Sequence, residues 1–407
     1  MIPLKAIVQA RRAIRDAIHV SPLEFSEKLS RSTGLSVYLK LENLHVTGSF
    51  KERGALCRLL HLSEAERLRG VITASAGNHA QGVAYHARRL GIRAKIVMPK
   101  GTPLIKVTST RELGGEVILH GDTYDDAYEE ARRICTAEEL CFIHPFDDEE
   151  VIAGQGTIGL ELLDQLPDVE AIVVPIGGGG LISGVAIAAK ESNPKIRIYG
   201  VQAQRYPSML RSIEANRILT LPAAHTIADG IAVKRVGEKT FPIVQRYVDE
   251  IVTVSEEEIA NAILTLLERE KCVVEGAGAT PVAALLHEKL HPRERSIALI
   301  LSGGNIDVNV ISRVIERGLV KAGRLACLIV SLPDRPGALH QLAGLFATAD
   351  ANILQIHHDR TFATLETAEV EVTLETRGPE QIETILTLLH EHGYAVHRKL
   401  EPADAQE

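Results

Sequence analysis

The sequence predicts an α/β protein with two domains, and three observations support this. Short segments rich in Val and Ile alternate with longer helical patterns from about residue 37 to residue 301. Such segments fit parallel strands that are buried on both faces. The pattern changes after about Gly323, and the 407 residues exceed one ordinary domain.

The elements of the first domain follow from where each pattern begins and ends. Residues 1–18 are predicted to form an amphipathic helix. The predicted helices after it are Asn78–Leu90, Tyr124–Ala137 and Gly156–Leu166. The predicted strands are Val37–Leu41, Gly70–Ala74, Ala94–Met98, Glu116–Leu119, Ala171–Pro175, Ile196–Val201 and Ile297–Leu301.

The second domain has the predicted order βαββαβ, which is the order of a ferredoxin-like unit. Its strands alternate in character, so we expect helices on one face of the sheet and a free face opposite. Residues 316–324 are the expected linker, and the tail at residues 402–407 is expected to be disordered. The predicted strands are Cys327–Leu332, Ile353–His357, Ala368–Glu375 and Tyr394–Leu400. The predicted helices are Pro336–Ala349 and Gly378–Glu391.

Charge and composition exclude several classes of protein. The net charge of -8 argues against nucleic acid and against an anionic membrane surface as partners. No apolar segment approaches the roughly 20 residues that span a bilayer, and the N-terminus lacks the pattern of a secretory signal. The five cysteines are scattered, so we expect no disulfide framework, no structural zinc site and a cytoplasmic location.

Two glycine-containing clusters stand at predicted strand-to-helix turns, where α/β sheets place ligands. In Thr47–Gly54, Lys51 follows an aromatic residue at the start of a helix, and desolvation there would free its amine as a nucleophile. An ordinary exposed lysine remains the alternative. Gly177–Gly180 follows an apolar strand and predicts a backbone cradle for a phosphate; the alternatives are a flexible turn and, with a poor fit to the fingerprint, a dinucleotide site.

Two further turns carry small polar side chains. Ser302–Asn305 follows a buried strand, so the Ser302 hydroxyl could offer a ligand one uncharged hydrogen bond; a plain tight turn explains it equally well. Ser75–His79 opens a helix, where backbone N–H groups could bind a carboxylate. His79 could equally be a packed structural histidine.

Taken in order, these segments resemble one family. SFKERGA, SAGNHAQG, VIAGQGTIGLE, GGGGL, IADGIAVK and SGGN are similar to motifs of the threonine/serine dehydratase branch of the fold type II pyridoxal-phosphate (PLP) enzymes, over about residues 5–320. The resemblance implies a catalytic domain at residues 1–320 that is like the tryptophan synthase β chain. It has two subdomains, the smaller one at roughly residues 51–148.

The resemblance also implies roles for individual residues. Lys51 is the Schiff-base lysine, Phe50 packs beside the cofactor ring, Asn78 bonds the cofactor's 3′-oxygen, and Ser302 meets the pyridine nitrogen. The phosphate is held by Gly177, Gly178, Gly179, Gly180 and Leu181. The loop over the substrate carboxylate consists of Ser75, Ala76, Gly77, Asn78 and His79.

The implied reaction is the deamination of L-threonine to 2-oxobutanoate and ammonia, with side activity on L-serine. A serine-preferring dehydratase and a serine racemase remain alternatives, as do a PLP-binding protein without catalysis and, most remotely, a dinucleotide oxidoreductase. Racemases carry a second serine where this chain has Ala76, and an asparagine at Phe146. Their divalent-cation ligands align near Gln202 and Ser208, which are neutral, so no metal site is expected.

The C-terminal unit, residues 325–401, resembles an ACT domain. The resemblance lies in Leu332–Leu339, the turn where family members bind amino acids. It implies an amino-acid effector, with isoleucine or valine inhibition pointing to biosynthesis and another response to catabolism. It also implies pairing of subunits into a homodimer or homotetramer. A domain that only dimerises is the alternative.

Overall fold

The computed structural model describes residues 2–359 and 367–399. The chain divides into two compact units, Met1–Asp307 and Val308–Glu407. The expected tail at residues 402–407 and the end of the last predicted strand lie outside the described residues. No helix in the described ranges is both long enough and apolar enough to cross a membrane.

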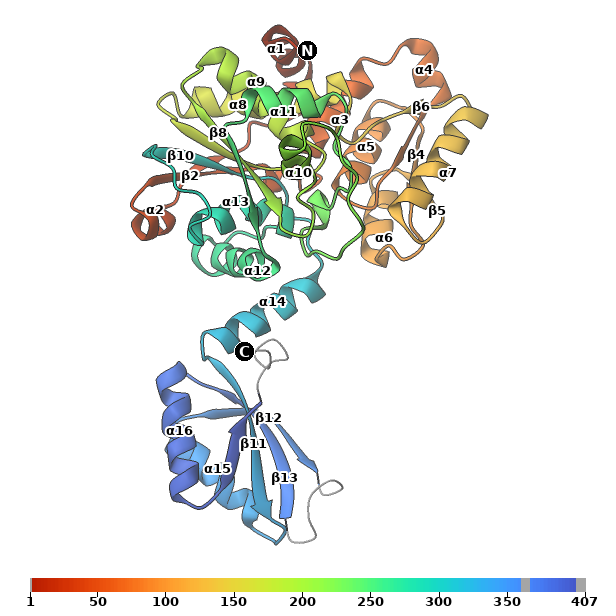
Figure 1. Cartoon of the computed structure of the whole chain (residues 1–407). Helices are drawn as coiled ribbons and strands as arrows, with labels where there is room; N and C mark the ends of the chain where they lie inside the picture. Colours follow the sequence, from red (N-terminus) through yellow and green to blue (C-terminus); the bar gives the residue numbers. More distant parts are fainter. Residues whose placement is uncertain (1, 360–366, 400–407) are drawn as a thin grey trace. The chain divides into compact units, whose positions relative to one another are not determined.

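The first unit contains two sheets, visible in the upper part of Figure 1. The larger sheet has the order β1-β2-β10-β7-β8-β9, and all its neighbours are parallel except the β1–β2 pair. The smaller sheet has the order β5-β4-β3-β6 and is parallel throughout. This confirms the predicted α/β class.

The strands of the first unit fall where apolar segments end at Gly, Pro or polar residues. Their bounds are β1 Leu23–Phe25, β2 Ser36–Leu41, β3 Val71–Ala74, β4 Ala94–Met98, β5 Glu116–Leu119, β6 Cys141–Phe142, β7 Ala171–Pro175, β8 Arg197–Ala203, β9 Glu250–Val254 and β10 Ser296–Leu301. The sequence pattern predicted seven of them, and it missed β1, β6 and β9. The last has the sequence EIVTV, with three apolar residues in five, and is half-buried along most of its length, so its pattern was present in the sequence and was overlooked.

The helices of the first unit connect these strands. Their bounds are α1 Leu4–Ile14, α2 Glu27–Thr33, α3 Lys51–Leu60, α4 Glu64–Arg69, α5 Asn78–Arg89, α6 Leu104–Glu112, α7 Tyr124–Ala137, α8 Glu149–Gln165, α9 Gly180–Ser192, α10 Ser208–Glu214, α11 Thr240–Tyr247, α12 Glu256–Thr265 and α13 Gly276–Leu286. The prediction for α8 began seven residues too late. The Asp148 side chain accepts bonds from the N–H groups of Glu150 and Val151 and starts the helix earlier.

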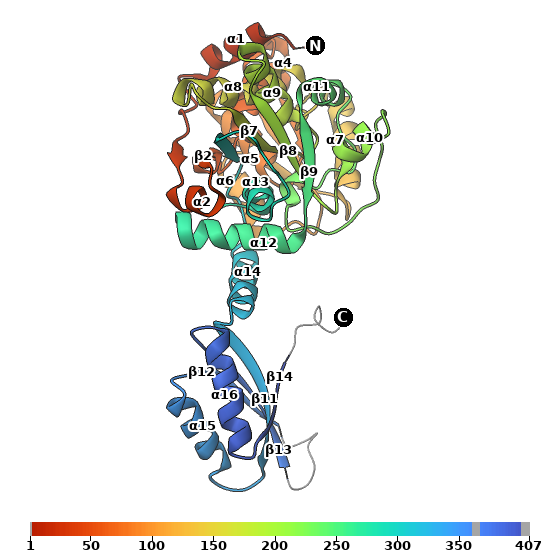
Figure 2. The same ribbon diagram turned by 60° about the vertical axis from the view of Figure 1, so that its left-hand side comes forward.

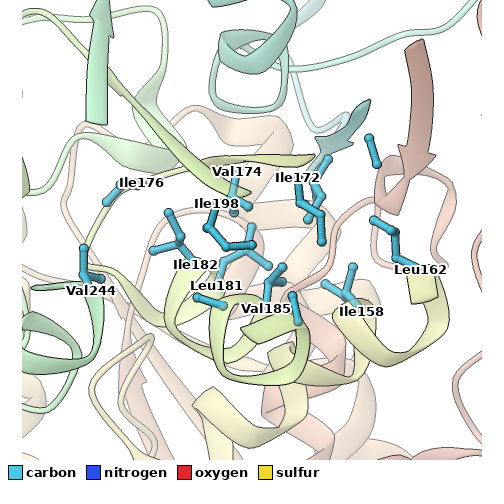
Figure 3. Packing of buried hydrophobic residues seen from close by; sticks show 14 of the residues in the cluster. Ile158, Leu162, Ile172, Val174, Ile176, Leu181, Ile182, Val185, Ile198 and Val244 are labelled. Atoms are coloured by element: carbon cyan, nitrogen blue, oxygen red, sulfur yellow. The ribbon is translucent and has the colours of Figure 1, made fainter. Parts of the chain in front are cut away.

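Helices cover both faces of each sheet. In the larger sheet α8 and α9 pack on one face, and α13 with α12 beside it on the other (Figures 1 and 2). Figure 3 shows the first of these cores, in which Ile158 of α8, Val185 of α9 and Ile172 of β7 interlock. In the smaller sheet, alternate strand residues face α5 and α7.

Glycines allow the helices behind the large sheet to approach closely. A Cβ added at Gly184 of α9 would lie 2.5 Å from the backbone nitrogen of Gly156 in α8. A Cβ at Gly154 would lie 2.6 Å from the Cα of Gly54 in α3. α8 is therefore packed backbone-to-backbone against both the helix that follows the glycine loop and the helix that begins with Lys51.

The second unit opens with α14 Val308–Lys321 and then forms an antiparallel sheet of order β12-β13-β11-β14. Its predicted βαββαβ order is confirmed. The elements after α14 are β11 Leu325–Pro333, α15 Ala338–Thr348, β12 Asn352–Asp359, β13 Thr367–Glu375, α16 Pro379–Glu391 and β14 Ala395–Arg398. The expected linker was wrong for residues 316–321, because these residues form the end of the amphipathic helix α14.

Candidate active site

The start of α3 is joined to the end of β10 by backbone contacts. The Phe50 N–H donates to the Ser302 carbonyl at 3.1 Å, and the Gly304 N–H donates to the Gly48 carbonyl at 2.9 Å. Ser49 and Gly303 form an antiparallel bridge between these bonds. Two clusters that are about 250 residues apart in the sequence thus form one wall of a site at the carboxyl ends of the strands.

Lys51 is the first residue of α3, and its side chain points into this site. Its Nζ donates to the carbonyl oxygen of Pro145 at 2.9 Å and lies 5.2 Å from the centre of the Phe50 ring. Burial lowers the pKa of Lys51 to about 8, against the opposing effect of the nearby Glu275 carboxyl. An amine with such a pKa is partly neutral near physiological pH and can act as a nucleophile.

A buried charge network holds the helix that carries Lys51. Arg53 and Lys40 are both 0% exposed. The Arg53 guanidinium donates to Glu42 and to Glu161, and the Lys40 ammonium also donates to Glu161. The carboxylates beside Arg53 raise its pKa against the effect of burial. α3 is therefore fixed to β2 and α8 by charge-assisted bonds.

The glycine loop lies between β7 and α9. Gly179 has a φ of +98°, a left-handed conformation that side chains rarely adopt. Among the described residues, no acceptor is found for the N–H groups of Gly177, Gly178 and Gly179. Unpaired N–H groups beside a helix N-terminus form an anion cradle, and Leu181 buries its side chain in the core beneath it.

Phe146 forms a wall of this cradle. A Cβ added at Gly178 would overlap the Phe146 ring, and one at Gly180 would lie 2.9 Å from the Phe146 carbonyl oxygen. The Gly178 carbonyl accepts a bond of 2.6 Å from the Thr240 hydroxyl. These contacts explain why glycine is required at both positions, and they keep the loop's N–H groups free.

Asn78, the first residue of α5, lies in a chain of hydrogen bonds across the site. Its Nδ2 donates to Glu275 Oε1 at 2.7 Å, and its Oδ1 accepts from Asn305 Nδ2 at 2.8 Å. Burial raises the pKa of Glu275 to about 8, with Asp229 adding to the effect. The second N–H of the Asn78 amide stays available to a ligand.

Ser302 follows β10 directly and is 2% exposed. In the described part of the chain no partner is found for its hydroxyl, which agrees with a role toward a bound group. The buried hydroxyl of Ser49 also has no partner. A buried lysine, a free amide cradle and a neutral hydroxyl fit an aldehyde cofactor that carries a phosphate and a ring nitrogen.

The predicted carboxylate loop lies between β3 and α5. Ser75, Ala76 and Gly77 are partly buried, and a Cβ added at Gly77 would meet no atom within 4 Å. The open space at Gly77 fits a substrate-facing loop. His79 is 3% exposed, and its Nε2 lies 3.1 Å from the Ile143 carbonyl oxygen. Burial lowers the pKa of His79 to about 3, so this imidazole is neutral and its contact is with the backbone.

Sequence reasoning missed several residues of this site. Glu275 had one signal, an isolated acidic residue between apolar residues and a helix start. Phe146 was noted only as a difference from racemases, and Asn305 only as part of a turn. The Pro145 carbonyl left no signal, because it is a backbone atom. Gln202, considered as a counterpart of a cation ligand, is fully buried and uses both ends of its amide on backbone groups.

Comparison with known proteins agrees with this geometry. The family model "Pyridoxal-phosphate dependent enzyme" matches residues 14–303, and the model "ACT domain" matches residues 328–393. A protein of Thermotoga maritima named L-threonine ammonia-lyase is 51% identical over 398 residues, which is 97% of this chain and 99% of that one. A protein of Geobacter sulfurreducens with the same name is 49% identical over the same shares.

Among solved structures, the processed form of threonine deaminase isoform 2 from Solanum lycopersicum has a TM-score of 0.74 and 42% sequence identity. The match covers 77% of this chain and 92% of that chain. The match is therefore long enough to include most of the first unit.

Proposed function

Since the chain belongs to the family of pyridoxal-phosphate-dependent enzymes, we propose that it is an L-threonine ammonia-lyase regulated through a C-terminal ACT domain. The net reaction converts L-threonine to 2-oxobutanoate and ammonia; the water that is eliminated first is taken up again in the final hydrolysis. The observation that carries the proposal is the Lys51 amine, held at the Pro145 carbonyl opposite a cradle of unpaired N–H groups.

Bound PLP withdraws electrons from the substrate's Cα, which is the chemistry the cofactor supplies. Lys51 would bond it covalently, and the N–H groups from Gly177 to Leu181 would hold its phosphate. Phe50 would pack beside the ring, and Asn78 would donate to its 3′-oxygen. The neutral Ser302 hydroxyl would meet the ring nitrogen without forcing a charge on it.

The chain's own groups would then manage the proton and the substrate. The Lys51 amine, once free, would accept the Cα proton, for which a pKa near the working pH is suited. The loop Ser75–His79 at the start of α5 would close over the substrate carboxylate and bind it through N–H groups other than that of Ser75, which donates to the Val97 carbonyl at 3.1 Å. His79 would keep this loop in place through its bond to the Ile143 carbonyl.

Ala76 argues against racemisation. A racemase must deliver a proton to the face of Cα opposite the lysine, and a methyl group has no proton to give. Serine is the closer competitor, because it lacks only one methyl group and such a difference discriminates by roughly 1–3 kcal/mol. We therefore propose a side activity that converts L-serine to pyruvate.

The test compares kcat/KM for L-threonine and L-serine in the purified holoenzyme. We expect threonine to be preferred and D-serine not to form. Lys51→Ala should abolish turnover and the absorbance near about 410–420 nm that marks a lysine-bound cofactor, whereas Lys100→Ala, at an exposed position, should keep both. Failure of threonine to turn over, or activity in Lys51→Ala, would overturn the proposal.

We assign catalysis to residues 1–320, with a smaller subdomain at about residues 51–148, and regulation to residues 325–401. The effector would be an amino acid at the turn Leu332–Leu339, where Gly337 adopts a φ of +90°. Titrating the full chain with isoleucine and valine should give a saturable change in activity that Gly337→Ala weakens. No response to any amino acid would contradict the regulatory role.

We also propose that the chain forms homodimers or homotetramers through the edges of the ACT sheet. β12 is an edge strand on which Leu354 is 55% exposed, and such edges pair readily. A solution mass of 44.3 kDa, that of one chain, would contradict this. Five free cysteines fit a cytoplasmic location, which cell fractionation would test.

A further inference from the structure

Three side chains that commonly bind transition metals meet at the C-terminal end of α3. Cys57 and His61 are four residues apart, so they lie on the same side of the helix. Glu150 comes from the first turn of α8. Lys51 lies six residues before Cys57, about 9 Å along the helix, so this cluster is separate from the site described above.

The ligand atoms of these three residues lie close together. Cys57 Sγ is 3.8 Å from Glu150 Oε2 and 4.0 Å from His61 Nδ1. Glu150 Oε2 and His61 Nδ1 are 3.3 Å apart. Tetrahedral Zn²⁺ with bonds of about 2.3 Å to sulfur and about 2.0–2.1 Å to nitrogen and oxygen places its ligand atoms about 3.3–3.6 Å from one another. The two distances from the Cys57 sulfur therefore need to shorten by only a few tenths of an ångström.

Exposure and charge also suit a cation at this position. Cys57 is buried, whereas the side chains of His61 and Glu150 are 45% and 39% exposed, so an ion could enter from solvent and keep a water ligand. In the described ranges Glu150 has no Lys or Arg partner, because the neighbouring Arg58 pairs with Asp148 at 3.3 Å. One thiolate and one carboxylate would balance the two charges of Zn²⁺.

We propose that Cys57, His61 and Glu150 form a Zn²⁺ site with water as the fourth ligand. As the Zn–S bond forms, the Cys57 thiol releases its proton to solvent. Without the ion, His61 Nδ1 donates to the Cys57 carbonyl oxygen at 2.8 Å; binding the ion at Nδ1 would break this bond and leave the ring's proton on Nε2. The scattered cysteines led us to expect no structural zinc site, yet Cys57 and His61 stand four residues apart, a spacing that places both on one side of a helix.

The ion would connect the two segments that hold the Lys51 amine. α3 begins with Lys51, and Pro145, whose carbonyl accepts from that amine, stands four residues before the start of α8. Zn²⁺ would therefore clamp α3 to α8 behind the active site. Because it binds only the folded chain in this geometry, it should also raise the temperature of unfolding.

The experiment uses chelator-treated holoenzyme and Co²⁺ as a spectroscopic probe for Zn²⁺. We expect one equivalent of Co²⁺ to produce cobalt–thiolate charge-transfer absorbance and tetrahedral d–d bands in the difference spectrum, and Zn²⁺ to displace both. Cys57→Ala should abolish the charge-transfer band. His61→Gln and Glu150→Gln should weaken Zn²⁺ binding by more than the roughly 10–100-fold that loss of an outer-shell partner costs.

Cys135→Ala and His120→Gln remove the same residue types elsewhere in the first unit and should leave the Co²⁺ spectrum unchanged. The partial exposure of His61 means that His61→Gln should fold even if Cys57→Ala does not, and retained cofactor absorbance verifies folding. Absence of saturable Co²⁺ absorbance would overturn the proposal. The same holds if the His61 and Glu150 variants bind Zn²⁺ as tightly as the parent.

Discussion

Replacing Glu161 by Gln removes one carboxylate from the buried charge network behind Lys51. In the folded chain its two oxygens accept bonds of 2.6 and 2.8 Å from Arg53 and one bond of 2.9 Å from Lys40. Both cations are completely buried. Water therefore cannot supply the acceptors that the amide of the variant lacks.

The magnitude follows from these three bonds. Glutamine keeps a single carbonyl oxygen, so at least one charge-assisted bond is lost, at about 1.5–3 kcal/mol. Arg53 and Lys40 also lose the negative charge of Glu161, and removing one partner of a buried ion pair costs about 3–5 kcal/mol. A unit that ends at Asp307 has an unfolding entropy of roughly 0.6 kcal/mol per degree. The unfolding temperature of the first unit should therefore fall by about 5–8 °C.

Calorimetry of the holoenzyme measures this shift, with loss of the cofactor absorbance as a second probe. Asp164→Asn is the matched control, since Asp164 lies one turn further along α8 and pairs with Arg11 at the surface, with a side chain 61% exposed. An exposed pair contributes about 0–1 kcal/mol, or less than about 2 °C here. Equal shifts for the two variants would refute the reasoning that burial gives the Glu161 network its stabilising effect.

Three further predictions concern the site and its pH dependence. Gly178→Ala should weaken PLP binding in a cofactor titration, because its Cβ overlaps the Phe146 ring, and adding Phe146→Ala should recover affinity; no recovery would contradict this packing. Burial raises the pKa of Glu275 to about 8, so Glu275→Gln should remove a change in kcat/KM above about pH 8, and an unaltered alkaline profile would count against it. Burial opposes the charged form of His45, but Glu42 and Glu52 raise its pKa from 6.5 to about 9. The protonated imidazole therefore stabilises the folded chain by roughly 3 kcal/mol, fully below pH 6.5 and not at all once the pH has risen through about 9. Urea unfolding of His45→Gln should lack this pH-dependent loss of stability.

The sequence predicted those elements whose pattern is local. β4, β5 and β7 begin and end at the predicted residues, because each is an apolar segment between polar or turn-forming residues. The start of α8 was wrong, since the cap at Asp148 lies outside the glycine-containing segment that defined the prediction. The linker expected from residue 316 is helical as far as Lys321, because α14 is amphipathic and buries Val314 on its apolar side.

The residues of the candidate site also divide into those that a local sequence pattern marks and those that no local pattern marks. The glycines after β7 and the lysine after Phe50 mark strand-to-helix turns, so the sequence alone indicated them. Glu275 could not be found with comparable ease, because its importance depends on contacts with distant segments: its N–H donates to the Gly303 carbonyl, and its side chain accepts from Asn78. Neither partner is near it in the sequence, and the helix dipole explains an acidic residue at a helix N-terminus equally well.

Phe146 shapes the candidate site through its neighbours. Its ring packs at 89° against His144, with ring centres 4.7 Å apart, and closes the space above Gly178. The same short segment offers the Pro145 carbonyl to Lys51, and its Asp147 side chain accepts from the N–H groups of Glu238 and Lys239 ahead of α11. An asparagine at 146 would place an amide donor beside the proposed anion cradle and leave the ring's volume unfilled. Three consecutive residues therefore contribute to the site in different ways: the Pro145 carbonyl accepts from Lys51, the Phe146 ring limits the space at Gly178, and Asp147 binds the chain ahead of α11.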